Sequence, residues 1–290
     1  MPWGNQSTFH EMTHQTDRVP EMVDRNDFSD LCVVHKLGMV EYGEAYQLQK
    51  RLQHKRLEGE ISDVLLLLEH PPTLTIGRSG SLENVLASRE QLTQEGISLF
   101  FIERGGDVTY HGPGQLVGYP IVDLSHRERD IHRYVRDLEE VLIRTLNDFS
   151  IIASRDKRHA GVWVEKEEVA AIGVSIRRWV TMHGFALNVN ANLKHFSFIN
   201  PCGFSDRKAT SMAQLLGREV PVETVTERLL AHFSDVFDTT IALDLVDRFS
   251  AKSTECQRRT YLKRTLLCTR QKEREGNPVR QDLAQNLQAF

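Results

Sequence analysis

The sequence has no long hydrophobic run. Its longest purely apolar stretch is Val64–Leu68, whereas a helix that crosses a membrane needs about 20 apolar residues. The first residues lack the basic start and apolar core of a secretory signal, and their mixed charge is not that of a transit peptide. We therefore expect a cytoplasmic protein that has no membrane partner.

Cysteine is scarce, and neither sign of charge predominates strongly. The four cysteines form no CxxC pair and no zinc-type spacing with histidine, and they are too few for a disulfide framework. We therefore expect reduced thiols and no metal site. The net charge of −4 over 290 residues gives no general attraction to nucleic acid, so no nucleic-acid partner is expected.

The charge is nevertheless unevenly distributed. From residue 248 to residue 290 there are ten basic residues and four acidic ones, so this tail carries +6 and the remaining body about −10. Such a tail can fold back on the body, recruit an acidic partner or simply be solvated. We predict an N-terminal extension at residues 1–30, a folded core domain at 31–245 and a basic C-terminal extension at 246–290.

Hydrophobic periodicity predicts both helices and strands. Apolar residues recur at helical spacing in 42–56, 131–149 and 222–237, and less clearly near 86–92. Short apolar or alternating runs predict strands at 33–37, 63–69, 73–76, 98–103, 120–124, 161–164, 169–176 and 185–190. Strands and helices do not alternate regularly, which favours an α+β fold with a mixed β-sheet and flanking helices.

Chemistry-bearing residues concentrate in a glycine-rich segment, Arg104–Gln115. Four glycines allow close backbone approach to a ligand, and Tyr110 and His111 lie between them. The spacing fits neither a dinucleotide fingerprint nor a P-loop. The segment is either a tight turn between strands or a ligand-binding loop, and the embedded Tyr-His favours the second interpretation.

A second candidate is Cys202, which stands between proline and glycine in INPCGF. A turn cysteine is often inert, because its chemistry needs the thiolate and hence a neighbouring base or cation. His183, in HGFALN, precedes a glycine and an alternating strand, and the small residues of VAAIGV suit a strand against which a ligand lies. Together, Cys202, His111 and His183 suggest thiol-based acyl transfer.

These motifs resemble those of the lipoyl(octanoyl) transferases. EHPPTLTIGRSG, RGGDVTYHGPGQLVGYP, HAGVWV, VAAIGV, HGFALNV, INPCGF and TSM occur in that order, and the likeness covers about residues 31–240. The resemblance implies a biotin/lipoate ligase-like catalytic domain. It also implies transfer of an octanoyl group from octanoyl-acyl carrier protein, through a cysteine thioester, to a lysine of lipoyl domains, in lipoate biosynthesis.

The resemblance assigns residues and partners. Cys202 would be the nucleophile, and the donor thioester makes a cofactor unnecessary. The acceptors would be the lipoyl domains of 2-oxo-acid dehydrogenase complexes and the glycine cleavage H protein. The residues implied to line the substrate site are Arg104, Gly105, Gly106, Asp107, Val108, Thr109, Tyr110, His111, Ala171, Ile172, Gly173, Gly184, Phe185 and Ala186.

One position departs from the family pattern. Where the family usually has a lysine close to the cysteine, this chain has Glu168, and a carboxylate there disfavours the thiolate. Lys166 could reach in from the same hairpin, or Lys208 or Arg207 could replace the missing cation. Alternatively the protein has impaired catalysis.

Two other functions remain open. A non-catalytic protein of the same fold would bind the octanoyl carrier or a lipoyl domain without turnover, a possibility raised by Glu168. An ATP-dependent lipoate ligase would share the fold, but it has no need of a nucleophilic thiol.

Overall fold

The computed structural model describes residues 30–157, 159–200 and 208–244. The strands are β1 Leu31–Met39, β2 Asp63–Glu69, β3 Thr73–Ile76, β4 Ser98–Phe101, β5 Val108–His111, β6 Gln115–Ile121, β7 Ser154–Arg155, β8 Gly161–Val164, β9 Glu167–Arg177, β10 Val180–Asn188, β11 Lys208–Ala209 and β12 Thr240–Leu243. The helices are α1 Tyr42–Leu57, α2 Arg89–Gln94, α3 Ile131–Asn147, α4 Met212–Leu216 and α5 Val222–Val236. Among the described residues, none of the helices has the length and apolar character that a membrane crossing requires.

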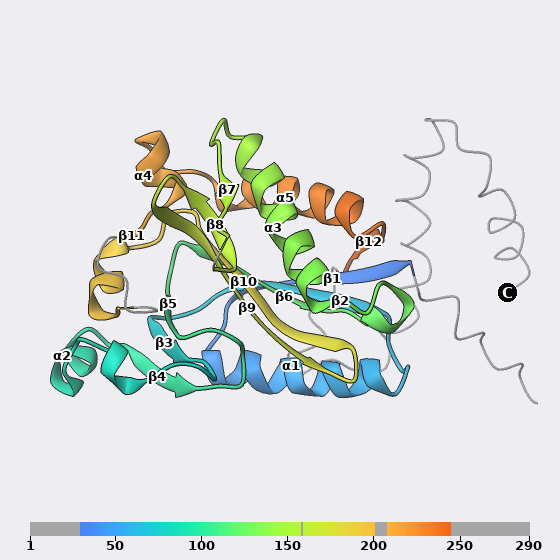
Figure 1. Cartoon of the computed structure of the whole chain (residues 1–290), viewed down its shortest axis with the longest axis horizontal. Coiled ribbons are helices and arrows are strands. Elements are labelled where there is room, and N and C mark those ends of the chain that lie inside the picture. The colour runs from blue at the N-terminus through green and yellow to red at the C-terminus, as the bar shows by residue number, and fades with distance from the viewer. Residues whose placement is uncertain (1–29, 158, 201–207, 245–290) are drawn as a thin grey trace, which may run out of the picture.

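Nine strands form one mixed sheet. Its order is β12-β1-β2-β6-β10-β9-β8-β7, and β11 pairs with β9 outside this path. β1 runs parallel to β2 and β12, and β11 runs parallel to β9, while the other pairs are antiparallel. A smaller sheet, β4-β3-β5, lies at one end of the large one (Figure 1). This arrangement confirms the predicted α+β class with a mixed sheet.

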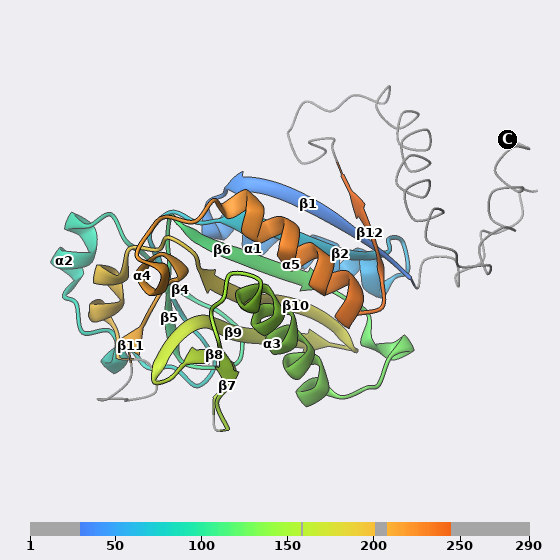
Figure 2. The same cartoon turned by 90° about the horizontal axis from the view of Figure 1, so that it is seen from above.

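Helices cover both faces of the large sheet. In Figure 1, α1 lies along one face and α3 and α5 lie on the other, and Figure 2 shows α3 and α5 side by side. The apolar run of β2 explains this burial on both sides, because successive side chains of a strand point to opposite faces. Val64, Leu66 and Leu68 pack in the α1 layer, whereas Leu65 and Leu67 pack in the α3–α5 layer.

Most of the predicted elements are confirmed, but the prediction of a strand at 120–124 was wrong in position. The strand is β6, which begins in the glycine-rich segment at Gln115 and ends at Ile121. The Asp123 side chain accepts a hydrogen bond from the Ser125 amide and thereby caps a short 3-10 helix, Leu124–His126. The glycine-rich segment also contains β5, so the tight turn is confined to the three residues between β5 and β6.

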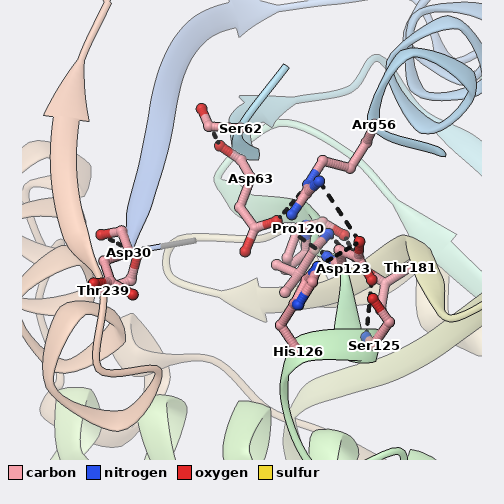
Figure 3. A network of polar contacts seen from close by, with 11 residues as sticks. Asp30, Arg56, Ser62, Asp63, Pro120, Asp123, Ser125, His126, Thr181 and Thr239 are labelled. Atoms are coloured by element: carbon pink, nitrogen blue, oxygen red, sulfur yellow. Dashed lines mark hydrogen bonds and ion pairs between the residues drawn. The ribbon is translucent and has the colours of Figure 1, made fainter. Parts of the chain in front are cut away.

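A buried ion network fastens the end of α1 to the large sheet (Figure 3). Arg56 Nε donates to Asp63 Oδ1 at 2.8 Å, and its Nη1 lies 3.6 Å from Asp123 Oδ2. The Asp123 amide donates to the same Asp63 oxygen at 3.0 Å. Because these charged groups are paired, the cost of removing them from water is partly offset. The network fixes α1, the helix that supplies aromatic side chains to the site described next.

Candidate functional site

A large cavity lies between β9, β10, the glycine-rich segment and α3. Its volume is about 1330 Å³. Most of the residues that the sequence assigns to substrate binding line it, together with Glu168 and His183. They are Arg104, Gly105, Gly106, Asp107, Val108, Thr109, His111, Ala171, Ile172, Gly173, Gly184, Phe185 and Ala186. The glycine-rich segment and the β9–β10 hairpin, which are far apart in sequence, therefore meet at one space.

Tyr110 takes a different position from its neighbours. Its side chain points away from the cavity into the small apolar core around β3 and β5. Its hydroxyl lies 2.8 Å from His195 Nδ1, and burial raises its pKa to about 12. Thr109 and His111 occupy the opposite face of β5 from Tyr110 and line the cavity, as does Val108 at the beginning of the strand.

Glycine is required where the loop crosses β9. The Gly105 amide donates to the Val174 carbonyl oxygen at 2.9 Å. A methyl group added at Gly173 would lie 2.9 Å from Arg104 Cδ and 3.0 Å from the Gly105 carbonyl oxygen. A side chain at Gly173 would therefore push the loop off the strand. The close approach places the loop over β9, where it forms one wall of the cavity.

Arg104 fixes the start of this loop. Its Nη2 donates to the Thr75 carbonyl oxygen at 2.8 Å and to Thr75 Oγ1 at 3.0 Å, and its Nη1 donates to the Gly105 carbonyl oxygen at 3.0 Å. The guanidinium thus ties the loop to β3, with its charge directed at backbone and hydroxyl oxygens. The side chain is buried, so these hydrogen bonds satisfy a charge removed from most solvent.

A hydrogen-bonded chain runs behind the cavity from β3 to β10. The Thr75 hydroxyl lies 3.4 Å from His111 Nε2, and His111 Nδ1 donates to Gln115 Oε1 at 2.8 Å. Gln115 Nε2 donates to Asn188 Oδ1 at 2.8 Å, and Asn188 Nδ2 donates to the Thr210 carbonyl oxygen at 2.9 Å. Because each group orients the next, the chain holds the walls of the cavity in one arrangement.

Two of the histidines that line the cavity, His111 and His183, are buried and uncharged at neutral pH. Burial lowers the pKa of His111 to about 3 and that of His183 to about 4. Burial also lowers the pKa of His70, whose ring centroid is 5.7 Å from that of His111, to about 4. These side chains therefore supply neutral hydrogen-bonding groups to the site and no positive charge.

His183 occupies an unusual backbone position. Its φ is +60°, a conformation that costs a non-glycine residue energy and is found most often at functional sites. Its ring stacks on Tyr46 with centroids 5.9 Å apart, and both of its buried ring nitrogens have no hydrogen-bond partner among the described residues. The ring thus presents unused donor and acceptor capacity at the cavity wall.

Glu168 and Lys208 lie at the other end of the cavity wall. Lys208 is opposite Glu167, and Ala209 is opposite Glu168, in the parallel pairing of β11 with β9. All four residues line the cavity. Lys166 is exposed at the turn between β8 and β9 and does not line it. Among the described cations that the sequence suggests as substitutes for the missing lysine, Lys208 is therefore the one at the cavity.

Sequence reasoning missed the wall that α3 contributes. Val135, Arg136 and the buried Glu139 line the cavity from this helix. Glu139 Oε2 accepts hydrogen bonds or ion pairs from Arg136 and Arg155, and its Oε1 accepts from the Gly161 amide. A fully buried glutamate on an amphipathic helix looks from sequence like an exposed residue. Two of its partners, Arg155 of β7 and Gly161 of β8, come from outside the helix, and the helical pattern does not reveal them.

Several predictions lie outside the described residues. Cys202 and Arg207 belong to the segment 201–207, and the N-terminal and C-terminal extensions are likewise almost entirely outside. Asn200 and Lys208, which flank the segment containing Cys202, both line the cavity. The site can therefore be described on both sides of this segment, and the role of the cysteine itself stays a prediction.

The family model that matches this chain and the known proteins that resemble it in sequence indicate the same family. The family model for the lipoyl protein ligase A/B catalytic domain matches residues 41–234. An octanoyltransferase of Caldicellulosiruptor saccharolyticus is 53% identical over 203 residues, covering 69% of this chain and 86% of the relative. An octanoyltransferase of Desulforamulus reducens is 46% identical over 206 residues, covering 71% and 90% of the two chains.

Solved structures share the fold at low identity. Lipoate-protein ligase A bound with ATP superposes with a TM-score of 0.62 at 17% identity, covering 74% of this chain and 89% of that one. Ta0514 from T. acidophilum, a putative lipoate protein ligase with bound lipoic acid, gives 0.59 at 14% identity, with the same two coverages. The fold is thus the predicted biotin/lipoate ligase-like catalytic domain. From its family model and its octanoyltransferase relatives, the chain belongs to the lipoyl protein ligase A/B catalytic-domain family and is an acyltransferase.

Proposed function

We propose that this protein transfers an octanoyl group from octanoyl-acyl carrier protein, through a thioester on Cys202, to a lysine of lipoyl domains. The observation that carries the proposal is the meeting of the three predicted substrate segments at one cavity, whose wall also includes both flanks of the segment with Cys202. The acceptors are the lipoyl domains of 2-oxo-acid dehydrogenase complexes and the glycine cleavage H protein, and the location is the cytoplasm.

The cavity offers apolar surface to an acyl chain. Its apolar wall includes Val108, Ala171, Ile172, Phe185 and Ala186, and each buried methylene contributes about 0.8 kcal/mol to binding. The chain of an octanoyl group therefore gains several kcal/mol from burial alone. That energy is available to hold the reacting carbonyl in place.

The chemistry consists of two acyl transfers. In the first, the Cys202 thiolate attacks the donor thioester, a new C–S bond forms, the donor C–S bond breaks, and the carrier leaves as its thiolate. In the second, the neutral acceptor amine attacks the enzyme thioester, a C–N bond forms and the C–S bond breaks, and the proton lost by the nitrogen converts the released Cys202 thiolate into its thiol. The donor is already an activated thioester, so neither step needs ATP.

Two competing functions predict different products. A lipoate ligase would attach free acid only when ATP is present, and the structural likeness to an ATP-bound ligase makes this a specific alternative. A non-catalytic protein would bind the carrier and leave the lipoyl domain unmodified. Neither alternative requires a reactive Cys202.

The test combines the purified protein, octanoyl-acyl carrier protein and an unmodified lipoyl domain, without ATP. We expect the lipoyl domain to gain one octanoyl group on its acceptor lysine, read by intact mass. The same mixture with free octanoate and ATP in place of the carrier should give no product. Attachment seen only with ATP, or carrier binding without any modified domain, would overturn the proposal.

A further inference from the structure

One buried side chain of the cavity wall offers two unused polar atoms. His183 lines the cavity and is 1% exposed, and neither of its ring nitrogens has a hydrogen-bond partner among the described residues. Burial lowers the pKa of the ring to about 4, so at neutral pH one nitrogen is a donor and the other an acceptor. Buried polar groups in folded proteins almost always have partners. Two unused nitrogens at a cavity therefore point to a polar group of a ligand.

The unusual backbone of His183 aims its ring at the α1 side of the large sheet. Residues two positions apart on a strand normally share a face, and Phe185 packs in the α3–α5 layer. The His183 ring instead stacks on Tyr46 of α1, with centroids 5.9 Å apart, and the His183 amide donates to Gln49 Oε1 at 2.9 Å. Its φ of +60° departs from extended backbone and accounts for this change of side. The strain thus serves to direct the ring.

A cluster of buried rings encloses this end of the cavity. Tyr119 meets the His183 ring edge-on with centroids 6.3 Å apart, and Tyr42 stacks on His111 at 5.8 Å. These four side chains line the cavity, and all four are buried. Tyr46, which does not line the cavity, stacks on both Tyr42 and His183 and so joins the rings to α1. The end of the cavity at His183 is therefore closed.

A distant part of the cavity wall is exposed. Lys157, between β7 and β8, and Lys208 of β11 both line the cavity and are exposed. Lys208 pairs with β9 at Glu167, whereas His183 pairs with β9 at Val174, seven positions further along the strand. At about 3.3 Å per residue, the two ends of the wall are roughly 23 Å apart. The cavity thus has an exposed end at β11 and a closed end at His183.

The way in which an acyl group enters this cavity follows from its attachment, an argument that rests on the proposed function. The donor acyl group is joined to a carrier protein through its carbonyl carbon, and a cavity of about 1330 Å³ cannot admit a protein. The carbonyl therefore stays towards the exposed end. The ω end of the chain, which is the end remote from the carbonyl, leads towards the ring cluster.

We propose that His183 is a specificity-determining residue that recognises the ω end of the acyl chain. Its two nitrogens form a hydrogen-bonding subsite among the rings at the closed end. A hydroxyl group at the ω end can donate to one nitrogen or accept from the other. A plain alkyl end that reaches the ring leaves both nitrogens unpaired and is disfavoured. The substrate class is therefore an acyl group that ends before the ring or carries a hydroxyl group at its ω end.

The experiment compares two acyl groups of equal length on the same enzyme. One is an ω-hydroxyacyl group, and the other is a plain acyl group with the same number of non-hydrogen atoms. Both are presented on acyl carrier protein, over a series of chain lengths that includes octanoyl. The readout is the ratio of kcat/KM for the hydroxylated chain to kcat/KM for the plain chain, in which a general loss of activity cancels. At the length that reaches His183, the wild-type protein should transfer the hydroxylated chain at least as well as the plain one.

Three variants identify the residue responsible. His183→Phe keeps a ring against Tyr46 but removes both nitrogens, so the ratio should fall at least about tenfold. Tyr42→Phe removes a hydroxyl group from the same ring cluster and is the matched control, whose ratio should stay within about twofold of the wild-type value. His183→Asn tolerates the positive φ and retains a donor and an acceptor, so it should keep part of the preference.

Two kinds of result would overturn the assignment. One is a wild-type protein that disfavours the hydroxylated chain about tenfold or more at every length. The other is a ratio that the His183 variants leave unchanged, or that Tyr42→Phe lowers as much as His183→Phe does. A wild-type protein that transfers no octanoyl group from the carrier is a different result, because it refutes the proposed function itself.

Discussion

Replacing Cys202 by serine is expected to lower the rate of octanoyl transfer to a lipoyl domain by about 10⁴-fold or more. A serine hydroxyl is not ionised near neutral pH, whereas a thiol has an appreciable thiolate fraction and is far more nucleophilic. Loss of a nucleophile typically removes nearly all catalysis that depends on it. The measurement is the initial rate of lipoyl-domain modification at saturating donor.

Cys256 provides the control, and Cys32 can be excluded as a substitute nucleophile. Cys256→Ser removes a thiol outside the predicted motifs and should transfer at the wild-type rate. Cys32 lies in the apolar core. Burial, and to a smaller extent the nearby Asp63 charge, raises the pKa of its thiol well above the ordinary value. It therefore cannot serve as a substitute nucleophile. A Cys202→Ser protein within tenfold of the wild-type rate would contradict the thioester route.

Acidification is expected to destabilise the fold by several kcal/mol between about pH 7 and pH 5. His70, His111 and His183 have folded-state pKa values of about 4, 3 and 4, all lowered by burial, against about 6.5 in an unfolded chain. Below pH 6.5 the unfolded chain takes up protons that the folded chain does not, so the free energy of unfolding falls as the pH falls. Each histidine then removes up to about 1.4 kcal/mol per pH unit.

At about pH 5 each histidine should have cost the fold about 2 kcal/mol, or about 6 kcal/mol for three independent groups. Local structure supports a neutral ring. His70 Nδ1 donates to the Val40 carbonyl oxygen at 2.7 Å, so Nε2 is left to accept from the Tyr119 hydroxyl, also at 2.7 Å. Urea unfolding at the two pH values measures the change.

The variant His70→Gln separates this effect from general acid sensitivity. The substitution itself lowers the stability of the fold. However, the free energy of unfolding of the variant should fall between the two pH values by about 2 kcal/mol less than that of the wild-type protein. The same pH dependence in both proteins would show that His70 is not buried in its neutral form.

The sequence predicts the large elements of this fold because their patterns are local. The apolar run of β2 and the helical period of α3 depend only on neighbouring residues, and both elements were predicted close to their observed bounds. The short strands β7, β11 and β12 could not be predicted. β11, with two residues, exists because Lys208 and Ala209 pair with β9, and no local pattern encodes that pairing.

In the candidate site, too, local patterns could be predicted from the sequence and tertiary contacts could not. Motif order and the resemblance indicated the segments that meet at the cavity. The conformational freedom of its glycines indicated that the segment Arg104–Gln115 is a ligand-binding loop. Alternation along β5, which excludes Tyr110 from the cavity, becomes visible only once the strand is known. The buried position of Glu139 depends on arginines from α3 and β7, so its contribution needed the tertiary structure.

The most direct test of the central claim is the intact mass of the protein after brief mixing with octanoyl-acyl carrier protein alone. We expect the mass to increase by one octanoyl group, located on Cys202. This added group should disappear when a lipoyl domain is added, and it should be absent from Cys202→Ser. An unmodified protein that nevertheless produces octanoylated lipoyl domain, or an adduct that the domain does not discharge, would contradict transfer through a Cys202 thioester.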